Sequence, residues 1–193
     1  GLLSFVEIDI RTMIRNQITE ADSGIWTAMT FISKNYMVFS ASIFTLYVVP
    51  KFAIIHTKKA FTLELKIIYK TILPLFGVGM LLVYFLRDYV ILIIYPDFTA
   101  MAPLFKWQLT GDFVRLATLV LGHQFIAKKM MKNFIFSEII SLALFYFLSH
   151  YLIKDYGVEG VVMAHLVRSI IMFGIIYYLV IRYFRKQNKS VKE

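Results

Sequence analysis

Long apolar stretches alternate with short polar segments along almost the whole chain. Five stretches are long enough to cross a bilayer, which takes about 20 apolar residues in a helix. They are residues 25–49, 67–86, 104–127, 134–153 and 158–181. Since each is several turns longer than an ordinary strand, the pattern predicts an all-α, polytopic bundle of transmembrane helices.

Two further apolar segments are too short to span. We interpret residues 1–14 as the end of a longer helix, because the chain opens inside an apolar run without an initiator methionine. Residues 89–95 are expected to form an interfacial or re-entrant turn that ends at Pro96. Two other prolines carry predictions: Pro50 closes the helix before it, whereas Pro74 kinks its helix without breaking it.

Composition supports a membrane protein. Hydrophobic residues make up 59% of the 193 residues and mean hydropathy is +0.70, whereas soluble domains are roughly 45–50% apolar. We expect one polytopic unit without a soluble core. The chain has no cysteine, which excludes disulfides, thiolate metal sites and cysteine nucleophiles. No cleavable signal peptide is recognisable.

The positions of the basic residues indicate the role of the net charge of +9. If the spans alternate, one side carries thirteen Lys and Arg and the other five, diluted there by acidic residues. The basic side includes the loops after residues 49 and 127 and the tail 182–193. The positive-inside rule therefore places these loops and the C-terminus in the cytoplasm. The excess charge is a topology signal that also contacts anionic headgroups, so no nucleic-acid partner is expected.

Charged residues inside the spans mark a polar interior. Asp112 and Arg115 lie mid-span, where each costs about 2.5–3.5 kcal/mol on insertion scales. Gln108, Asp112, Arg115, Leu119 and Gly122 form one helical stripe. At a spacing of i, i+3, Asp112 and Arg115 can pair. The sequence leaves two interpretations open: a self-neutralising structural pair, or a gated contact that faces a central cavity.

Two more charges have different interpretations. Lys34 lies deep in its span, and we favour an unpaired ammonium that faces the cavity, suited to a diphosphate or to another carboxylate. Glu138 lies one turn into its span, near the predicted cytoplasmic interface. There the simpler interpretation is favoured, in which the carboxylate complements the helix dipole.

The remaining polar candidates are aromatic or cationic. His165 and Arg168 are spaced i, i+3, and Arg168 is expected to find a carboxylate on another helix or a phosphate. His123 and His150 lie near span ends and are expected at the interface. Trp26 begins a helix, where it belongs to an interfacial aromatic belt or stacks on a sugar.

No catalytic constellation is present in the sequence. It has no Walker A loop, no HExxH, no nucleophile elbow and no DDxxD-type acidic pair. Transport is therefore favoured over chemistry.

Two alternative functions belong to other classes of protein. A membrane glycosyltransferase or polymerase would need a large loop with carboxylates, and the longest loops have about seventeen residues; a non-transporting scaffold would tolerate neutralisation of the intramembrane charges.

Several stretches match a known family in order and spacing. They are Arg15-Asn16, Gly24 to Met29, Ile32-Ser33, Tyr36, Leu46 to Pro50, Phe98 to Met101, Leu104 to Asp112, Ile126 to Lys128, Phe134, Glu138 and Tyr156-Gly157. They resemble the C-terminal half of Wzx-type flippases, the polyprenyl-linked oligosaccharide translocases of the multidrug/oligosaccharidyl-lipid/polysaccharide exporter superfamily. Within that family the chain looks most similar to the common-antigen (lipid III) branch.

The resemblance implies twelve helices in two six-helix lobes. Residues 1–193 would form the C-lobe, from the end of helix 7 at 1–14 to helix 12 at 158–181, and the N-lobe is absent. It implies a transporter, not an enzyme, of the bacterial inner membrane. Such a protein moves undecaprenyl-diphosphate-linked oligosaccharide to the periplasmic leaflet by alternating access, for O-antigen in lipopolysaccharide biosynthesis or for enterobacterial common antigen. A drug or lipid II exporter of the superfamily is the alternative.

The resemblance also bears on partners and residues. No bound cofactor is implied, although a proton or sodium gradient would drive the cycle. Besides substrate, membrane lipids and the N-lobe, the candidate partners are a polysaccharide polymerase and a chain-length regulator. Asp112, Lys128 and Glu138 fall on family motifs, whereas Lys34 replaces an expected acidic residue, which weakens any proton-coupling role there. The candidate cavity or substrate residues are Trp26, Lys34, Gln108, Asp112, Arg115, Glu138, His165 and Arg168.

Overall fold

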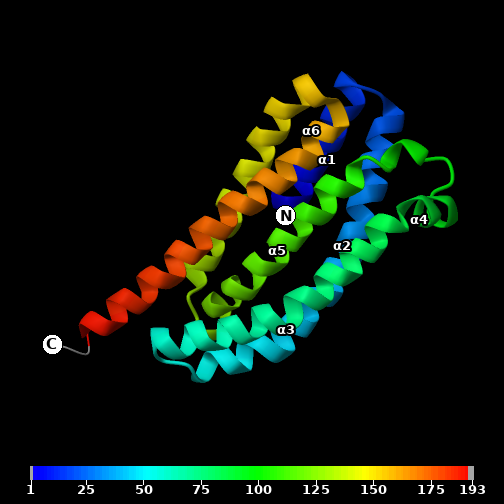
Figure 1. Cartoon of the computed structure of the whole chain (residues 1–193). Coiled ribbons are helices and arrows are strands. Elements are labelled where there is room, and N and C mark those ends of the chain that lie inside the picture. Colours follow the sequence, from blue (N-terminus) through cyan, green and yellow to red (C-terminus); the bar gives the residue numbers. More distant parts are fainter. Residues whose placement is uncertain (1, 191–193) are drawn as a thin grey trace.

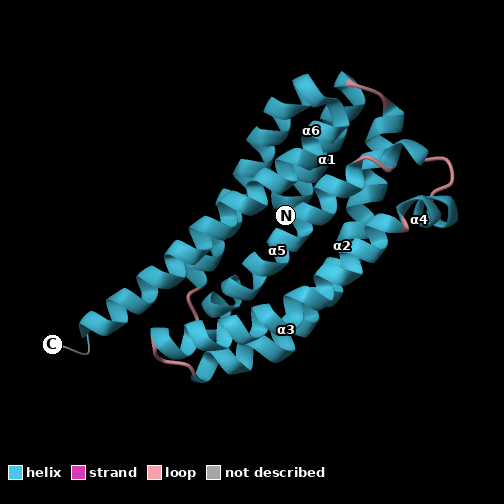
Figure 2. Ribbon diagram, in the orientation of Figure 1, coloured by secondary structure: helices cyan, strands magenta, loops and turns pink. Residues whose placement is uncertain are grey.

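A computed structural model describes residues 2–190, and these are helical almost throughout (Figure 2). The elements are α1 (Leu2–Gln17), α2 (Glu20–Ile54), α3 (Lys58–Phe85), α4 (Arg87–Ile94), the 3₁₀ turn η1 (Thr99–Met101), α5 (Leu104–Ala127) and α6 (Met131–Ser190). The described part of the chain contains no strand. The all-α prediction is confirmed. Gly1 of the first predicted segment and Lys192 of the basic tail lie outside the described residues.

Helices α2, α3 and α6 are long and apolar enough to cross a membrane. Helix α5 is not among them, although its 24 residues could span roughly 36 Å. It packs instead against α2, α3 and α6 (Figure 1). Surrounded in this way, α5 keeps Gln108 and Asp112 buried. Contacts with the neighbouring helices thus avoid the free-energy cost of placing the Asp112 charge in lipid.

Helix α6 is a hairpin of two arms that meet at Gly157, and it contains the predicted spans 134–153 and 158–181. Gly157 has φ 57 and ψ −140, a left-handed conformation that glycine adopts without strain. Three residues on, a Cβ at Gly160 would lie 2.3 Å from the Leu152 carbonyl oxygen. Figure 1 shows the chain turning back at this point, so that the arms lie side by side.

The α2–α3 loop, the α5–α6 loop and the C-terminal end of α6 all lie at one end of the bundle (Figure 1). A direct contact joins the first two, because the Lys128 ammonium donates to the Ala53 carbonyl at 2.8 Å. Partial burial at this contact lowers the pKa of Lys128 below its ordinary value. The basic loops that the sequence assigned to one side therefore do gather on one side.

The prediction that Pro50 closes a helix is wrong. Helix α2 runs through Pro50 to Ile54. Its last turn is held from outside: Lys51 pairs with Glu64 of α3 at 2.5 Å, and the rings of Phe52 and Phe61 lie 4.8 Å apart. Such contacts offset the hydrogen bond that a proline removes. Pro74 lies inside α3 as predicted, and the short α4 precedes Pro96.

Candidate functional site

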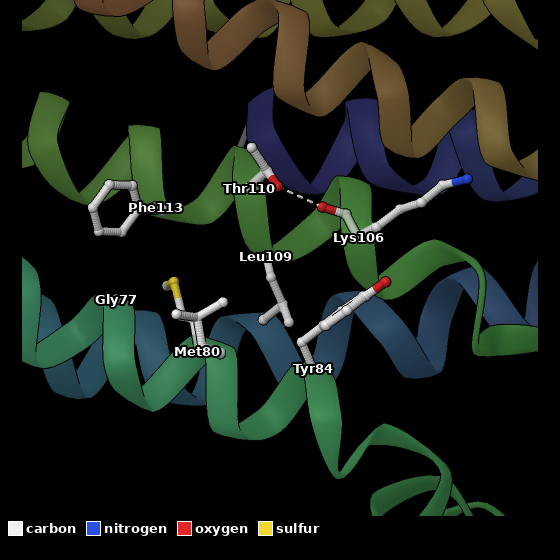
Figure 3. Close-up of a pocket in the computed structure, with 8 residues that line it drawn as sticks. Gly77, Met80, Tyr84, Lys106, Leu109, Thr110 and Phe113 are labelled. Carbon is white, nitrogen blue, oxygen red and sulfur yellow. Dashed lines mark hydrogen bonds between the residues drawn. The ribbon is translucent and has the colours of Figure 1, made fainter.

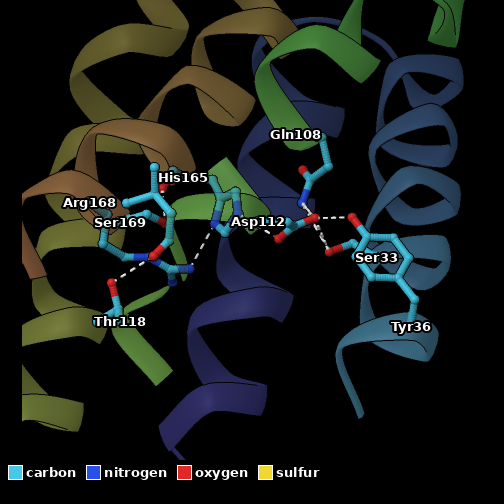
Figure 4. Close-up of polar contacts among 9 residues, drawn as sticks. Ser33, Tyr36, Gln108, Asp112, Thr118, His165, Arg168 and Ser169 are labelled. Atoms are coloured by element: carbon cyan, nitrogen blue, oxygen red, sulfur yellow. Dashed lines mark hydrogen bonds and ion pairs between the residues drawn. The ribbon is translucent and has the colours of Figure 1, made fainter. Parts of the chain in front are cut away.

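Asp112 of α5 is the centre of a buried polar cluster, and its exposed fraction is 0%. Its Oδ2 atom accepts from Ser33 Oγ at 2.6 Å, from Gln108 Nε2 at 3.1 Å and from Tyr36 Oη (Figure 4). Gln108 also donates to Ser33 Oγ at 3.1 Å. A carboxylate in such a place needs these donors, because burial of an unpaired charge is expensive.

The second carboxylate oxygen of Asp112 faces α6. His165 Nε2 lies 2.9 Å from Asp112 Oδ1, and Arg168 Nη2 lies 2.7 Å from His165 Nδ1. A guanidinium can only donate, so Nδ1 accepts and the imidazole proton is on Nε2. His165 therefore donates to Asp112 and accepts from Arg168, as Figure 4 shows. The three side chains form one chain from cation to anion, with a neutral ring between them.

The close approach of α5 and α6 depends on a glycine. A Cβ at Gly111 would lie 2.7 Å from His165 Cδ2 and 3.2 Å from the Leu166 Cα atom. No side chain fits that space unless the two helices move apart. Gly111 precedes Asp112 in α5, so the residue that admits the imidazole adjoins the residue that binds it.

A cavity of about 350 Å³ lies beside this cluster, among α2, α5 and both arms of α6. Two guanidinium groups line it, those of Arg115 and Arg168, and Glu138 supplies a carboxylate. Arg168 is 8% exposed, and its guanidinium also lies over the Phe145 ring, 4.7 Å from the centroid. Arg115 is exposed. Serine and threonine hydroxyls complete a polar wall, including those of Thr118 and Ser141.

The expected pairing of Asp112 with Arg115 is not what the structure shows. Asp112 turns toward α2 and α6, whereas Arg115, less than one turn further on, lines the cavity. The cause is the supply of donors on the neighbouring helices, which the spacing within one helix does not reveal. Arg168 does reach a carboxylate on another helix, but only through His165.

Lys34 does not lie in the Arg115 cavity and is not unpaired. Its ammonium contacts Glu7 of α1 at 2.6 Å, with the Lys34 side chain 48% and the Glu7 side chain 24% exposed. Both line a separate pocket of about 230 Å³ between α1 and α2. Trp26 lines the same pocket, yet it is only 5% exposed and so is packed rather than presented to a ligand.

His123 is buried within the bundle. It is 2% exposed, its Nδ1 lies 2.6 Å from the Leu119 carbonyl oxygen, and its Nε2 lies 3.1 Å from Thr45 Oγ1. His150 is more exposed, with its side chain 33% exposed and its Nε2 3.4 Å from Asp9 of α1.

A third pocket, of about 400 Å³, lies between α3 and α5 and is mainly apolar. Figure 3 shows Met80, Leu109 and Phe113 on its walls, with Lys106 and Thr110 at its edge. The exposed Leu81 of α3 also belongs to this apolar lining. The pocket lacks the converging polar groups of the Arg115 cavity, so the latter is the better candidate for a charged ligand.

The sequence indicated six members of the site on α5 and α6: Gln108, Asp112, Arg115, Glu138, His165 and Arg168. It did not single out Ser33 and Tyr36 as ligands of Asp112, nor Gly111 and Glu7. Glu7 carried a usable signal, because it is a carboxylate inside an apolar run. The role of Gly111 depends on the distance between two helices, and one-dimensional patterns do not contain it.

Comparison with known proteins gives two relatives of the same kind. The chain is 31% identical over 169 residues to the lipid III flippase of Escherichia coli strain K12, and equally to that of Shigella flexneri. Each match covers 87% of this chain and 41% of the relative, so the chain spans about two fifths of the length of these relatives. The resemblance to Wzx-type flippases is confirmed. No family model matches the chain, and no solved structure does.

Proposed function

We propose that this chain, a membrane protein related to the lipid III flippases, is the C-terminal lobe of a transporter that moves lipid-linked oligosaccharide across the membrane. The cargo is an undecaprenyl-diphosphate-linked sugar unit, as for enterobacterial common antigen. Residues 1–193 supply the end of helix 7 through helix 12. An N-terminal lobe elsewhere in the full protein closes the other side of the central cavity.

The observation that supports this role is the pair of guanidinium groups on the wall of the 350 Å³ cavity. Guanidinium forms bidentate, charge-assisted hydrogen bonds with phosphate. Arg168 is oriented in advance by His165 and Phe145, whereas Arg115 is exposed and has no carboxylate partner within residues 2–190. Arg115 is thus free to meet the diphosphate first, and Arg168 to hold it.

Glu138 is the carboxylate of this cavity. We assign it the task of balancing the two arginines when no substrate is bound. The role of Asp112 is indirect: its carboxylate acts on Arg168 through His165 and does not exchange with substrate. Trp26 and Lys34, in the pocket between α1 and α2, are then supporting residues outside the diphosphate site.

In this function the chain has a defined orientation and defined partners. The end that carries the α2–α3 and α5–α6 loops faces the cytoplasm of a bacterium, with the C-terminus, by the positive-inside rule. The substrate enters from that side of the inner membrane. A proton or sodium gradient drives the rocking of the lobes, and the polysaccharide polymerase and the chain-length regulator act on the product in the periplasm.

Complementation of a flippase-null strain by the full-length protein tests the proposal. Arg115→Ala should abolish complementation at a normal protein level, because charge-assisted hydrogen bonds are worth about 1.5–3 kcal/mol each, or roughly 10- to 150-fold in affinity. Full activity of that variant would contradict the assignment. A panel of strains that lack different exporters distinguishes this substrate from a drug or lipid II, since only the oligosaccharide strains should be rescued.

A further inference from the structure

A fourth cavity, away from the Arg115 cavity, lies between the two arms of α6 at the end of the bundle that carries the C-terminus (Figure 1). Its volume is about 480 Å³. Lys132 and Asn133 come from the start of the first arm, and Arg182, Tyr183 and Lys186 from the end of the second. The hairpin at Gly157 brings these distant segments together.

The charge of this pocket is uncompensated. None of the residues that line it is acidic. No ion pair joins Lys132, Arg182 or Lys186 to a carboxylate among residues 2–190. Arg182 and Lys186 are spaced i, i+4 on one helix, where like charges destabilise each other. Three cations gathered in a concave site without a counterion favour an anionic ligand.

The pocket also has apolar lining residues, and these define the ligand further. Phe136 lines it and is 54% exposed. One turn along the same arm, Ile139 is 52% exposed, so the apolar surface continues from the pocket toward the middle of the bundle. A ligand that satisfies both surfaces carries a phosphate at one end and a hydrocarbon chain at the other.

We infer that this pocket binds the phosphate headgroup of an anionic membrane lipid, with the hydrocarbon chain along Phe136. Basic pockets between transmembrane helices recognise lipid headgroups in this way. Arg182 also lines a neighbouring basic pocket, with Lys58 and Arg185, which makes it the residue of greatest expected effect. The site is separate from the proposed cargo cavity.

Native mass spectrometry of the full-length protein with phosphatidylglycerol or phosphatidylcholine tests the inference. Wild type should bind phosphatidylglycerol preferentially, and Arg182→Gln/Lys186→Gln should lower its affinity about tenfold. The matched control is Lys59→Gln/Lys66→Gln, which removes the same charge from α3 outside the pocket and should change affinity less than twofold. Equal losses in both variants would overturn the inference, since surface charge alone would then explain binding.

Two further experiments distinguish a lipid from free phosphate. Phe136→Ser should weaken phosphatidylglycerol binding severalfold, whereas Ile139→Ser, one turn further on, should weaken it less. Inorganic phosphate at millimolar concentration should displace little lipid. Complete displacement by inorganic phosphate, together with an unaltered affinity in Phe136→Ser, would overturn the lipid assignment. All four replaced cations and both apolar residues are exposed, so an unchanged thermal midpoint is the expected check on folding.

Discussion

His165 Nε2 lies 2.9 Å from Asp112 Oδ1, and this contact connects the polar cluster of α2 and α5 to the arginine on the cavity wall. On the far side of the ring, Nδ1 contacts Arg168 at 2.7 Å. One imidazole thus fixes both the carboxylate and the guanidinium. The position of a cavity cation is therefore set by residues that do not themselves line the cavity.

Loss of the ring should destabilise the protein. His165→Ala leaves Asp112 Oδ1 without its α6 donor and Arg168 without its acceptor, and buried hydrogen bonds to charged groups are worth about 1.5–3 kcal/mol. The free energy of unfolding of the full-length protein in detergent should fall by that amount. The control is His150→Ala, because His150 is a third exposed and 3.4 Å from Asp9. Its effect should be under about 1 kcal/mol; equal losses would contradict the role of His165.

Replacement of Gly111 should separate α5 from α6. In Gly111→Ala the new methyl group would lie 2.7 Å from His165 Cδ2, and overpacking of this kind costs about 1–3 kcal/mol. Complementation should fall with stability. Gly122→Ala is the matched control on the same helix, since its Cβ meets nothing within 4 Å. That variant should be neutral or more stable by up to about 1 kcal/mol, because alanine is the better helix former. A tolerated Gly111→Ala beside a harmful Gly122→Ala would refute the packing argument.

Exchange of the two charges between positions 7 and 34 should preserve the Lys34–Glu7 contact. Lys34→Glu places two carboxylates where the structure has a 2.6 Å ion pair, so we expect a severalfold lower protein level, although the pair itself contributes under about 1 kcal/mol because Lys34 is half exposed. Glu7→Lys/Lys34→Glu should restore that level, as measured by immunoblotting of membranes. A double variant no better than the single one would show that α1 and α2 are not joined by this contact.

The hydrophobic pattern was sufficient to predict the long helices, although the segment of α4 was expected to be a turn. The basic residues correctly predicted that their loops gather at one end of the bundle (Figure 1). The charges of Asp112 and Arg115 indicated that α5 contributes to a polar interior. The end of α2 was predicted wrongly, because Pro50 is compensated by Lys51–Glu64 and by Phe52 against Phe61. Such compensation comes from another helix and is invisible in the local sequence.

The same holds for the functional site: contacts within one helix were predicted, and contacts between helices were not. Spacing within a helix correctly grouped Gln108 with Asp112 and His165 with Arg168. It failed for Asp112 and Arg115, because the choice of partner was made by donors on α2 and α6. The prediction that Lys34 is unpaired was wrong for the same reason, since its partner Glu7 belongs to α1. Contacts between helices depend on crossing geometry, which for this site is set at Gly111.

The contact between Arg115 and the diphosphate of the cargo can be tested by translocation with the full-length protein in proteoliposomes. The measured quantity is the rate at which a diphosphate-linked oligosaccharide lipid reaches the opposite leaflet. Arg115→Ala should lower that rate at least tenfold. Lys106→Ala, which removes a cation of the same helix outside the Arg115 cavity, should stay within about twofold of wild type. A wild-type rate for Arg115→Ala, or an equal loss in Lys106→Ala, would show that Arg115 makes no specific contact with the diphosphate.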